Sequence, residues 1–144
     1  MELRYQDHCQ NIIWEEVSIL LQNVGMSFTN AATHRISFEN SHTIIFVFDQ
    51  NELIGFGRML SDGVRQSALY DIAVHPAYQG RNIGKEIVSR LISTTPECNI
   101  ILYASPGKED FYRRLGFKKM KTGMALFANQ ERMTDGVFVE VDKL

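Results

Sequence analysis

The sequence is poor in the features that define several large classes of protein. Its two cysteines, Cys9 and Cys98, have no metal-ligand neighbours, so we expect neither a disulfide framework nor a metal site. No apolar run approaches the roughly 18 residues of a membrane-spanning helix, and the first residues lack the apolar core of a signal peptide. The net charge of −2 leaves no basic excess for nucleic acid. We therefore expect a cytosolic protein that contacts neither membrane nor nucleic acid.

The composition that remains is that of one folded domain. The 144 residues are 44% hydrophobic and 22% charged, which is typical of a globular chain with a single core. No repeat, low-complexity tract or linker divides the sequence, so we expect one domain over residues 1–144. A cluster of Lys and Arg between residues 113 and 121 is either a solvated surface or a local aid to an anionic ligand.

Apolar periodicity predicts an alternation of helices and strands. Helical spacing predicts a helix over residues 8–24, a second from 83 to about 94, and a short one over 109–115 that Gly116 ends. Residues 27–41 are either a short helix or a mobile loop. Strand patterns cover residues 3–5, 43–48, 53–60, 67–74, 99–104, 124–127 and 137–141.

The order of these elements predicts an α+β domain with a mixed sheet. Residues 43–60 form a hairpin, and the strand at 99–104 lies parallel to the one at 67–74 because a helix connects them. Gly55 and Gly57 within a strand indicate a bend or the close approach of another element. The strand at 137–141 either completes this sheet or pairs with a second chain in a homodimer.

Residues 69–92 are the stretch around which the chain is organised. They pass from an apolar strand through a Pro, Gly and Asn turn into an amphipathic helix. The first backbone N–H groups of such a helix have no intrahelical acceptor, and the helix dipole adds partial positive charge there. This element therefore predicts a site for a phosphate or pyrophosphate.

The turn itself reads Gln79-Gly80-Arg81-Asn82-Ile83-Gly84. It matches neither the P-loop nor the Gly-x-Gly-x-x-Gly pattern. Preceded by Ile-Ala-Val-His-Pro-Ala-Tyr, it resembles the acyl-CoA pyrophosphate loop of the GNAT superfamily of N-acetyltransferases. The first glycine of the family pattern is Asn82 here. Because Asn tolerates positive φ better than other non-glycine residues, we expect the loop to keep its shape.

A second segment, Phe111-Tyr112-Arg113-Arg114-Leu115-Gly116-Phe117, resembles the late helix of the same family. The two matches together cover residues 53–127 and are most similar to small single-domain bacterial members. The resemblance implies a GNAT-like fold, which has a central, mostly antiparallel mixed sheet of about 6–7 strands. Helices lie on both faces of that sheet, and a splayed parallel strand pair forms the CoA site.

The resemblance also implies an activity. We expect acetyl-CoA as cosubstrate and transfer of its acetyl group to a primary amine of a small molecule or peptide, by direct attack in a ternary complex. A noncatalytic acyl-CoA-binding regulatory module of the same fold is the alternative. The residues of the first 50 positions match the family only in outline, so the acceptor amine is not specified by the sequence.

By the same resemblance, strand residues beside the pantetheine arm and loop amides around the pyrophosphate bind the cofactor, with Val74 N–H also polarising the thioester carbonyl. Arg81 and Lys85 either add charge to this site or face water. Ser105 stands where many relatives have an Asn that contacts the cofactor. The predicted cofactor-binding residues are Ile72, Ala73, Val74, Gln79, Gly80, Arg81, Asn82, Ile83, Gly84, Lys85 and Ser105.

Two residues are assigned catalytic roles. Tyr112 matches the family tyrosine near the CoA sulfur and is expected to act as general acid toward the leaving thiolate. Asp71 is our preferred general base, with Tyr70, His34 and His75 or ordered water as alternatives. Strand alternation sends Tyr70 and Asp71 to opposite faces, so we expect at most one of them to face the amine.

Overall fold

The computed structural model describes residues 2–129, 133 and 136–141, in two compact units, Met1–Leu102 and Tyr103–Leu144. Within its described part, the first unit holds a sheet of β1 (Leu3–Gln6), β2 (Thr43–Asp49), β3 (Glu52–Ser61), β4 (Gln66–Val74) and β5 (Asn99–Ile101). It also holds the helices α1 (Trp14–Asn23), α2 (Ala31–Glu39) and α3 (Ile83–Ser93) and the 3₁₀ turn η1 (Pro76–Tyr78). The second unit contains α4 (Glu109–Arg114).

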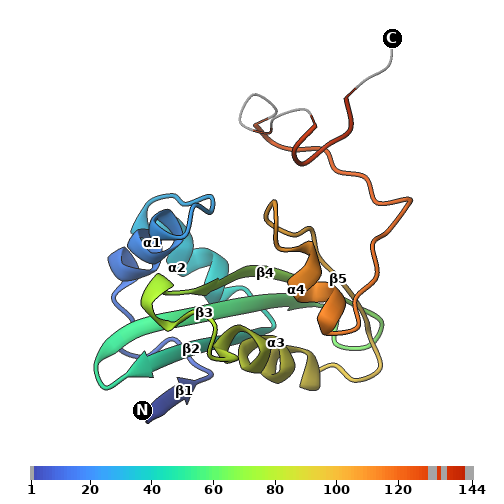
Figure 1. Ribbon diagram of the computed structural model, residues 1–144. Helices are drawn as coiled ribbons and strands as arrows, with labels where there is room; N and C mark the ends of the chain where they lie inside the picture. Colours follow the sequence, from blue (N-terminus) through green and yellow to red (C-terminus); the bar gives the residue numbers. More distant parts are fainter. Residues whose placement is uncertain (1, 130–132, 134–135, 142–144) are drawn as a thin grey trace. The chain divides into compact units, whose positions relative to one another are not determined.

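The sheet has the order β1-β2-β3-β4-β5 and is mixed (Figure 1). The first four strands are antiparallel neighbours, whereas β5 runs parallel to β4. This confirms the predicted α+β class, the hairpin of β2 and β3, and the parallel pair. The described residues form five paired strands, which is fewer than the six or seven that we expected.

One face of the sheet packs against α1 and α2. Its core is aromatic: the Phe38 ring of α2 stacks on Phe46 at 5.2 Å between centroids, and meets the edge of Phe56 at 5.7 Å. All three side chains are almost completely buried. Trp14 packs at the margin of this cluster, which agrees with its place beside the apolar stripe of the helix. Residues 27–41 thus supply a helix whose role is to cover this face.

The opposite face packs against α3, as Figure 1 shows. The helix buries Ile83, Ile87, Val88 and Leu91. It can approach closely because β3 has glycines beneath it. A Cβ at Gly57 would lie 2.6 Å from Ile72 Cδ1 and 2.9 Å from Ile87 Cγ2. The close approach that the strand glycines predicted is therefore confirmed.

The first helix begins later than predicted, at Trp14 rather than residue 8. The Gln6 amide donates to the carbonyls of both His8 and Gln10, at 2.8 Å each, and Asn11 adopts a left-handed φ of 62°. These interactions hold the segment in a turn, so its carbonyls do not enter a helical ladder. Apolar spacing alone did not reveal this competition.

The strands predicted at residues 124–127 and 137–141 are also wrong. The first segment has no regular secondary structure, and in the second a turn is closed by the Gly136 N–H donating to Val139 O. Met124 and Leu126 are 98% and 94% exposed. The predicted strand at 99–104 ends at Ile101, where its pairing with β4 ends. Strand propensity depends on a neighbour to pair with, which an alternating sequence does not itself supply.

We predict that Gly57→Ala destabilises the protein by about 1–3 kcal/mol, because the added methyl group overpacks the contact between β3 and α3. Urea unfolding followed by circular dichroism measures this change. Gly123→Ala is the matched control, since its Cβ would make an ordinary 3.7 Å contact with Met120. Equal midpoints for the two variants would contradict the role of Gly57.

Candidate active site

The loop between β4 and α3 has the backbone geometry of an anion site. Gly80 and Asn82 both lie in the left-handed region, with φ of 80° and 63°. The first helical hydrogen bond runs from Glu86 N–H to Asn82 O at 3.1 Å. The amides of the three preceding residues, 83–85, thus have no intrahelical acceptor. The expectation that Asn82 adopts positive φ in place of a glycine is confirmed.

Side chains tie this loop to the sheet. Gln79 Nε2 donates to Val74 O at 2.9 Å, and the Tyr78 hydroxyl donates to Asp49 Oδ2 at 2.5 Å. The hydrogen bond to Asp49 raises the pKa of Tyr78. The Arg81 guanidinium lies over the Tyr78 ring, 5.4 Å from its centroid. The loop is therefore anchored both to the end of β4 and to the turn between β2 and β3.

The edge of β4 beside this loop is open over part of its length. Strand β5 pairs only with Gln66–Ala68, so in the described part of the first unit no strand follows β4 along residues 69–74. The His75 amide donates across the sheet to Ile54 O at 2.7 Å. Because successive peptide groups point to opposite sides of a strand, the Val74 N–H and C=O face the open edge. The same alternation turns the backbone of Ala73 toward Phe56 of β3.

A bulge interrupts β4 next to this edge. Arg58 is opposite Tyr70 and Phe56 is opposite Ala73, so two residues of β4, Asp71 and Ile72, face the single Gly57. At the bulge the backbone of Asp71 adopts a left-handed φ of 56°, a strained conformation for a non-glycine residue. Our expectation that Tyr70 and Asp71 point to opposite faces is wrong, because the extra residue breaks the alternation of side chains.

Both side chains contact one guanidinium. Arg58 Nε donates to Asp71 Oδ2 at 2.7 Å, while Arg58 Cζ lies 5.2 Å from the Tyr70 ring centroid and 5.9 Å from that of Phe38. The contact with Phe38 puts this group on the face covered by α1 and α2. The charged side chains are largely enclosed, with exposed fractions of 16% for Arg58 and 20% for Asp71.

His34 of α2 lies near this ion pair and is 5% exposed. Its Nε2 accepts a hydrogen bond from the Thr29 amide at 2.9 Å, so the neutral ring carries its proton on Nδ1. Burial lowers the pKa of His34, Asp71 opposes this shift, and Arg58 adds to it. The lone pair of His34 Nε2 is thus already used as an acceptor for a backbone N–H. The same holds for His75, whose Nδ1 accepts from the Ala77 amide at 3.0 Å.

The second unit contains the other two predicted site residues. The Ser105 carbonyl accepts from the Lys108 amide at 2.9 Å, just before α4. Tyr112 lies on α4 with its ring edge-on to Phe111 and Phe117, at 4.9 and 5.7 Å. Burial raises the pKa of Tyr112 to about 12. Gly116 ends this helix with a φ of 96°, as predicted.

Two residues of the first unit were missed by reasoning from the sequence. Arg58 is a charged residue within the otherwise apolar run of residues 53–60, and such a residue requires a partner when the strand is buried. That signal was available and would have pointed to a nearby acid. Tyr78 gave no such signal, because its hydrogen bond to Asp49 joins segments that are distant in sequence.

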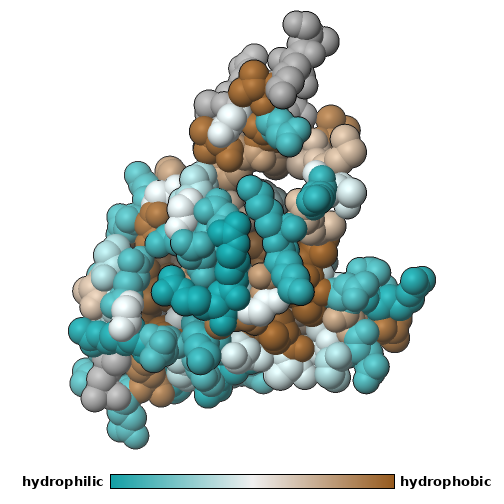
Figure 2. All heavy atoms as spheres, turned by 45° about the vertical axis from the view of Figure 1, so that its right-hand side comes forward, coloured by the Kyte–Doolittle hydropathy of each residue, from teal (hydrophilic) through white to brown (hydrophobic). Residues whose placement is uncertain are grey.

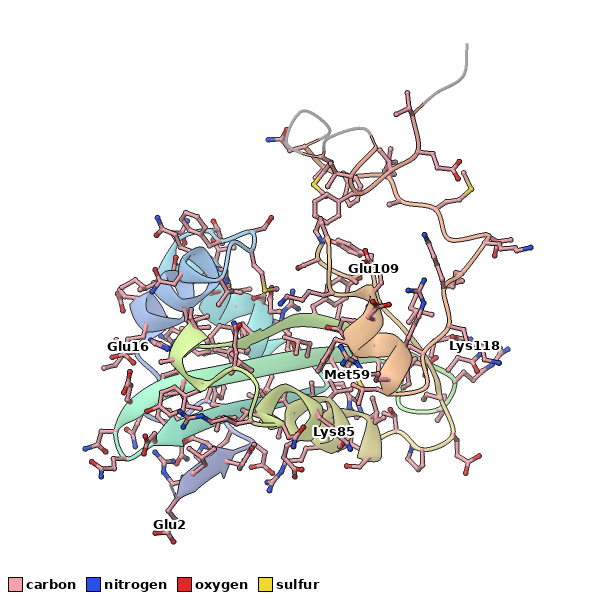
Figure 3. All side chains as sticks on the ribbon, in the orientation of Figure 1. Glu2, Glu16, Met59, Lys85, Glu109 and Lys118 are labelled. Carbon is pink, nitrogen blue, oxygen red and sulfur yellow. The ribbon has the colours of Figure 1, made fainter. Side chains whose placement is uncertain are left out.

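The first turn of α3 carries Lys85, which Figure 3 labels. On the face of the molecule drawn in Figure 2, hydrophilic residues cover much of the surface, and hydrophobic residues show in smaller patches between them. None of the helices in the described part of the chain is long and apolar enough to cross a membrane. The predicted cytosolic location stays a prediction.

A known family of proteins matches most of this chain. The family described as "Acetyltransferase (GNAT) domain" matches residues 15–130. The chain therefore belongs to the GNAT superfamily of N-acetyltransferases, as its two sequence motifs indicated, and is an acetyltransferase.

Individual relatives agree with this family. The chain is 31% identical over 127 residues to "Uncharacterized N-acetyltransferase ycf52" of Porphyra purpurea, which covers 83% of this chain and 73% of that protein. It is 28% identical over 108 residues to "GCN5-related N-acetyltransferase 1, chloroplastic" of Arabidopsis thaliana, and the match covers 72% of this chain and 55% of that protein. A probable acetyltransferase of unknown function from Staphylococcus aureus has the same fold, with a TM-score of 0.76 and 24% identity over 88% of this chain and 99% of that chain.

We predict a loss of stability on acidification that depends on His34. Its folded-state pKa lies below the ordinary value of 6.5, so the stabilising effect is complete above pH 6.5 and is lost as the pH falls through the lowered pKa. Urea midpoints at pH 7.5 and pH 5 measure this loss. A His34→Gln variant should show a smaller difference between the two pH values than the wild type. A His8→Gln variant, which changes an exposed histidine, should behave as the wild type does.

Proposed function

We propose that the protein transfers an acetyl group from acetyl-CoA to a primary amine of a small molecule or peptide, by direct attack in a ternary complex. The observation that carries the proposal is the loop at the start of α3. Asn82 reproduces the left-handed backbone of a glycine there, next to the stretch of β4, residues 69–74, that has no strand neighbour in the described part of the first unit. Together these features supply a site for a phosphate and a site for an extended amide chain.

The residues of the first unit fit acetyl-CoA. The amides of Ile83, Gly84 and Lys85 would hold the pyrophosphate, with the charges of Arg81 and Lys85 nearby. The Val74 N–H and C=O would pair with the pantetheine amides as a further strand would. Because Gln79 Nε2 now donates to Val74 O, the ligand would share or displace that bond. Gln79 thus acts mainly by joining loop and strand.

The chemistry requires a neutral amine, a polarised carbonyl and a protonated thiolate. Asp71 would take a proton from the amine, directly or through water, as the new N–C bond forms. Val74 N–H would stabilise the developing charge on the carbonyl oxygen. As the C–S bond breaks, Tyr112 would donate its proton to the thiolate. With its pKa raised to about 12, this phenol is protonated at neutral pH and so is available as a donor.

Release of free CoA from acetyl-CoA tests the reaction. We would measure it with arylalkylamines, polyamines, amino acids and peptides as acceptors, and identify the acetylated product by mass spectrometry. Acetyl-CoA binding is measured separately by calorimetry. Binding without turnover on any amine would reject the enzyme and leave the noncatalytic acyl-CoA-binding module.

With an accepted amine in hand, Tyr112→Phe tests the proton donor. The variant keeps the ring that packs on Phe111 and Phe117, so it should fold normally and bind acetyl-CoA with unchanged affinity. We expect kcat to fall by about 10²–10⁴-fold, the usual contribution of a positioned acid or base. Tyr5→Phe, on β1, serves as the control. Full kcat in Tyr112→Phe across the pH range would remove Tyr112 as the acid.

Substitutions at Asn82 test the anion site. Asn82→Gly should bind acetyl-CoA with nearly the wild-type affinity, since glycine adopts the same φ without strain. Asn82→Val should weaken binding by about tenfold, because a left-handed residue with a side chain costs about 1–2 kcal/mol and β-branching adds to this. Calorimetry gives both dissociation constants. A severalfold gain in affinity for Asn82→Gly would instead show that asparagine has weakened the family loop.

A further inference from the structure

The ion pair between Arg58 and Asp71 lies within the sheet rather than at its surface. It joins β3 to β4 at the bulge, on the face that α1 and α2 cover. In contrast, the other ion pairs in the described part of the first unit, Arg35 with Glu39 and Arg90 with Glu86, are exposed pairs within single helices. Of these three ion pairs, Arg58 with Asp71 is therefore the one whose charges folding largely removes from water.

An enclosed ion pair stabilises the contact between two strands less than apolar side chains of similar size would. Enclosing two charges costs desolvation energy that apolar side chains would avoid, and a non-glycine residue in the left-handed region adds strain. Asp71 carries both the desolvation cost of an enclosed charge and the strain of a left-handed φ. Strained, charged residues of this kind concentrate at sites where they have a chemical task.

The surroundings of Arg58 fix its position. Its guanidinium lies beside the rings of Phe38 from α2 and Tyr70 from β4, while Nε is bonded to Asp71 Oδ2. The histidine that interacts electrostatically with this pair is His34 of α2, whose Nε2 is bound to the Thr29 amide. Arg58 is thus held by packing and can in turn hold the carboxylate in one orientation.

That orientation leaves the second carboxylate oxygen available. Asp71 Oδ1 makes no hydrogen bond to any residue that the structure describes, whereas Oδ2 is occupied. No side-chain oxygen or nitrogen of these residues is both buried and without a partner. Oδ1 is therefore at least partly accessible, and the ion pair to which it belongs lies on the face of the sheet that α1 and α2 cover.

We propose that Arg58 is the positioning residue of the acceptor-amine site, holding Asp71 so that Oδ1 accepts the N–H of the attacking amine. The inference rests on the proposed function, in which Asp71 is the base. In the transfer step the amine proton passes to Oδ1 or to a water bound there. Arg58 keeps its charge throughout and exchanges no proton. Its guanidinium fixes one carboxylate oxygen so that the other is the one presented to the amine.

A double-mutant cycle tests this assignment on the full-length protein with an amine that the wild type acetylates. Arg58→Gln should lower kcat/KM for the amine at least tenfold and leave the acetyl-CoA dissociation constant within about twofold. Arg58→Lys should recover part of the loss, since it keeps the charge but loses the planar guanidinium. Asp71→Asn made in the Arg58→Gln background should add little, because the two residues act as a unit.

Arg35→Gln is the matched control, because it removes an arginine from an exposed ion pair of similar length, 2.6 Å, without touching the sheet. It should keep wild-type kinetics. Thermal unfolding of every variant separates loss of folding from loss of positioning. If Arg58→Gln does not fold, Arg58→Lys and the cycle built on it replace it.

Three outcomes would overturn the proposal: wild-type kcat/KM in Arg58→Gln, additive effects in the cycle, or a parallel loss of acetyl-CoA affinity that indicates a purely structural role. Failure of the wild type to acetylate any amine would instead reject the proposed function itself, and the role of Arg58 with it. The two failures are distinguished by the wild-type assay alone.

Discussion

The close contact between α3 and β3 is the constraint on which the arrangement of the first unit depends. Gly55 and Gly57 place no side chain at two positions of β3 that face α3, so Ile87 and Leu91 of α3 lie directly above the strand there. A helix seated this closely has little freedom to slide or rotate. Gly55 and Gly57 of β3 thus help to fix the position of the first turn of α3 and of the free amides in that turn.

The same strand has a different function on its other face. Where glycine faces α3, Arg58 faces α1 and α2 and binds Asp71 across the bulge. The sheet therefore separates α3, whose first turn is the proposed anion site, from the charged pair. The edge of β4 borders both faces. A ligand lying along this edge could contact the helix amides at one end and the carboxylate at the other without crossing the sheet.

The sequence predicted those parts of the structure that local patterns determine. Residues 79–84 specify a left-handed turn and a helix start because Gly80, Asn82 and the following apolar period act within a few positions. The bulge at Asp71 was missed, since residues 69–74 read as a regular strand and only the register with β3 shows the extra residue. The late start of α1 depends on the Gln6 side chain, and strand formation by the C-terminal segments depends on pairing with another strand. Both are tertiary effects that periodicity does not record.

Asn82 has a thermodynamic consequence beyond the shape of the loop. A glycine at this position would leave the unfolded chain more conformational freedom, which folding would then have to restrict. An asparagine leaves less backbone entropy to lose when the loop and the first turn of α3 form. The choice between these two residues therefore acts first on the free energy of unfolding, and an Asn82→Gly protein can keep its binding properties while being less stable.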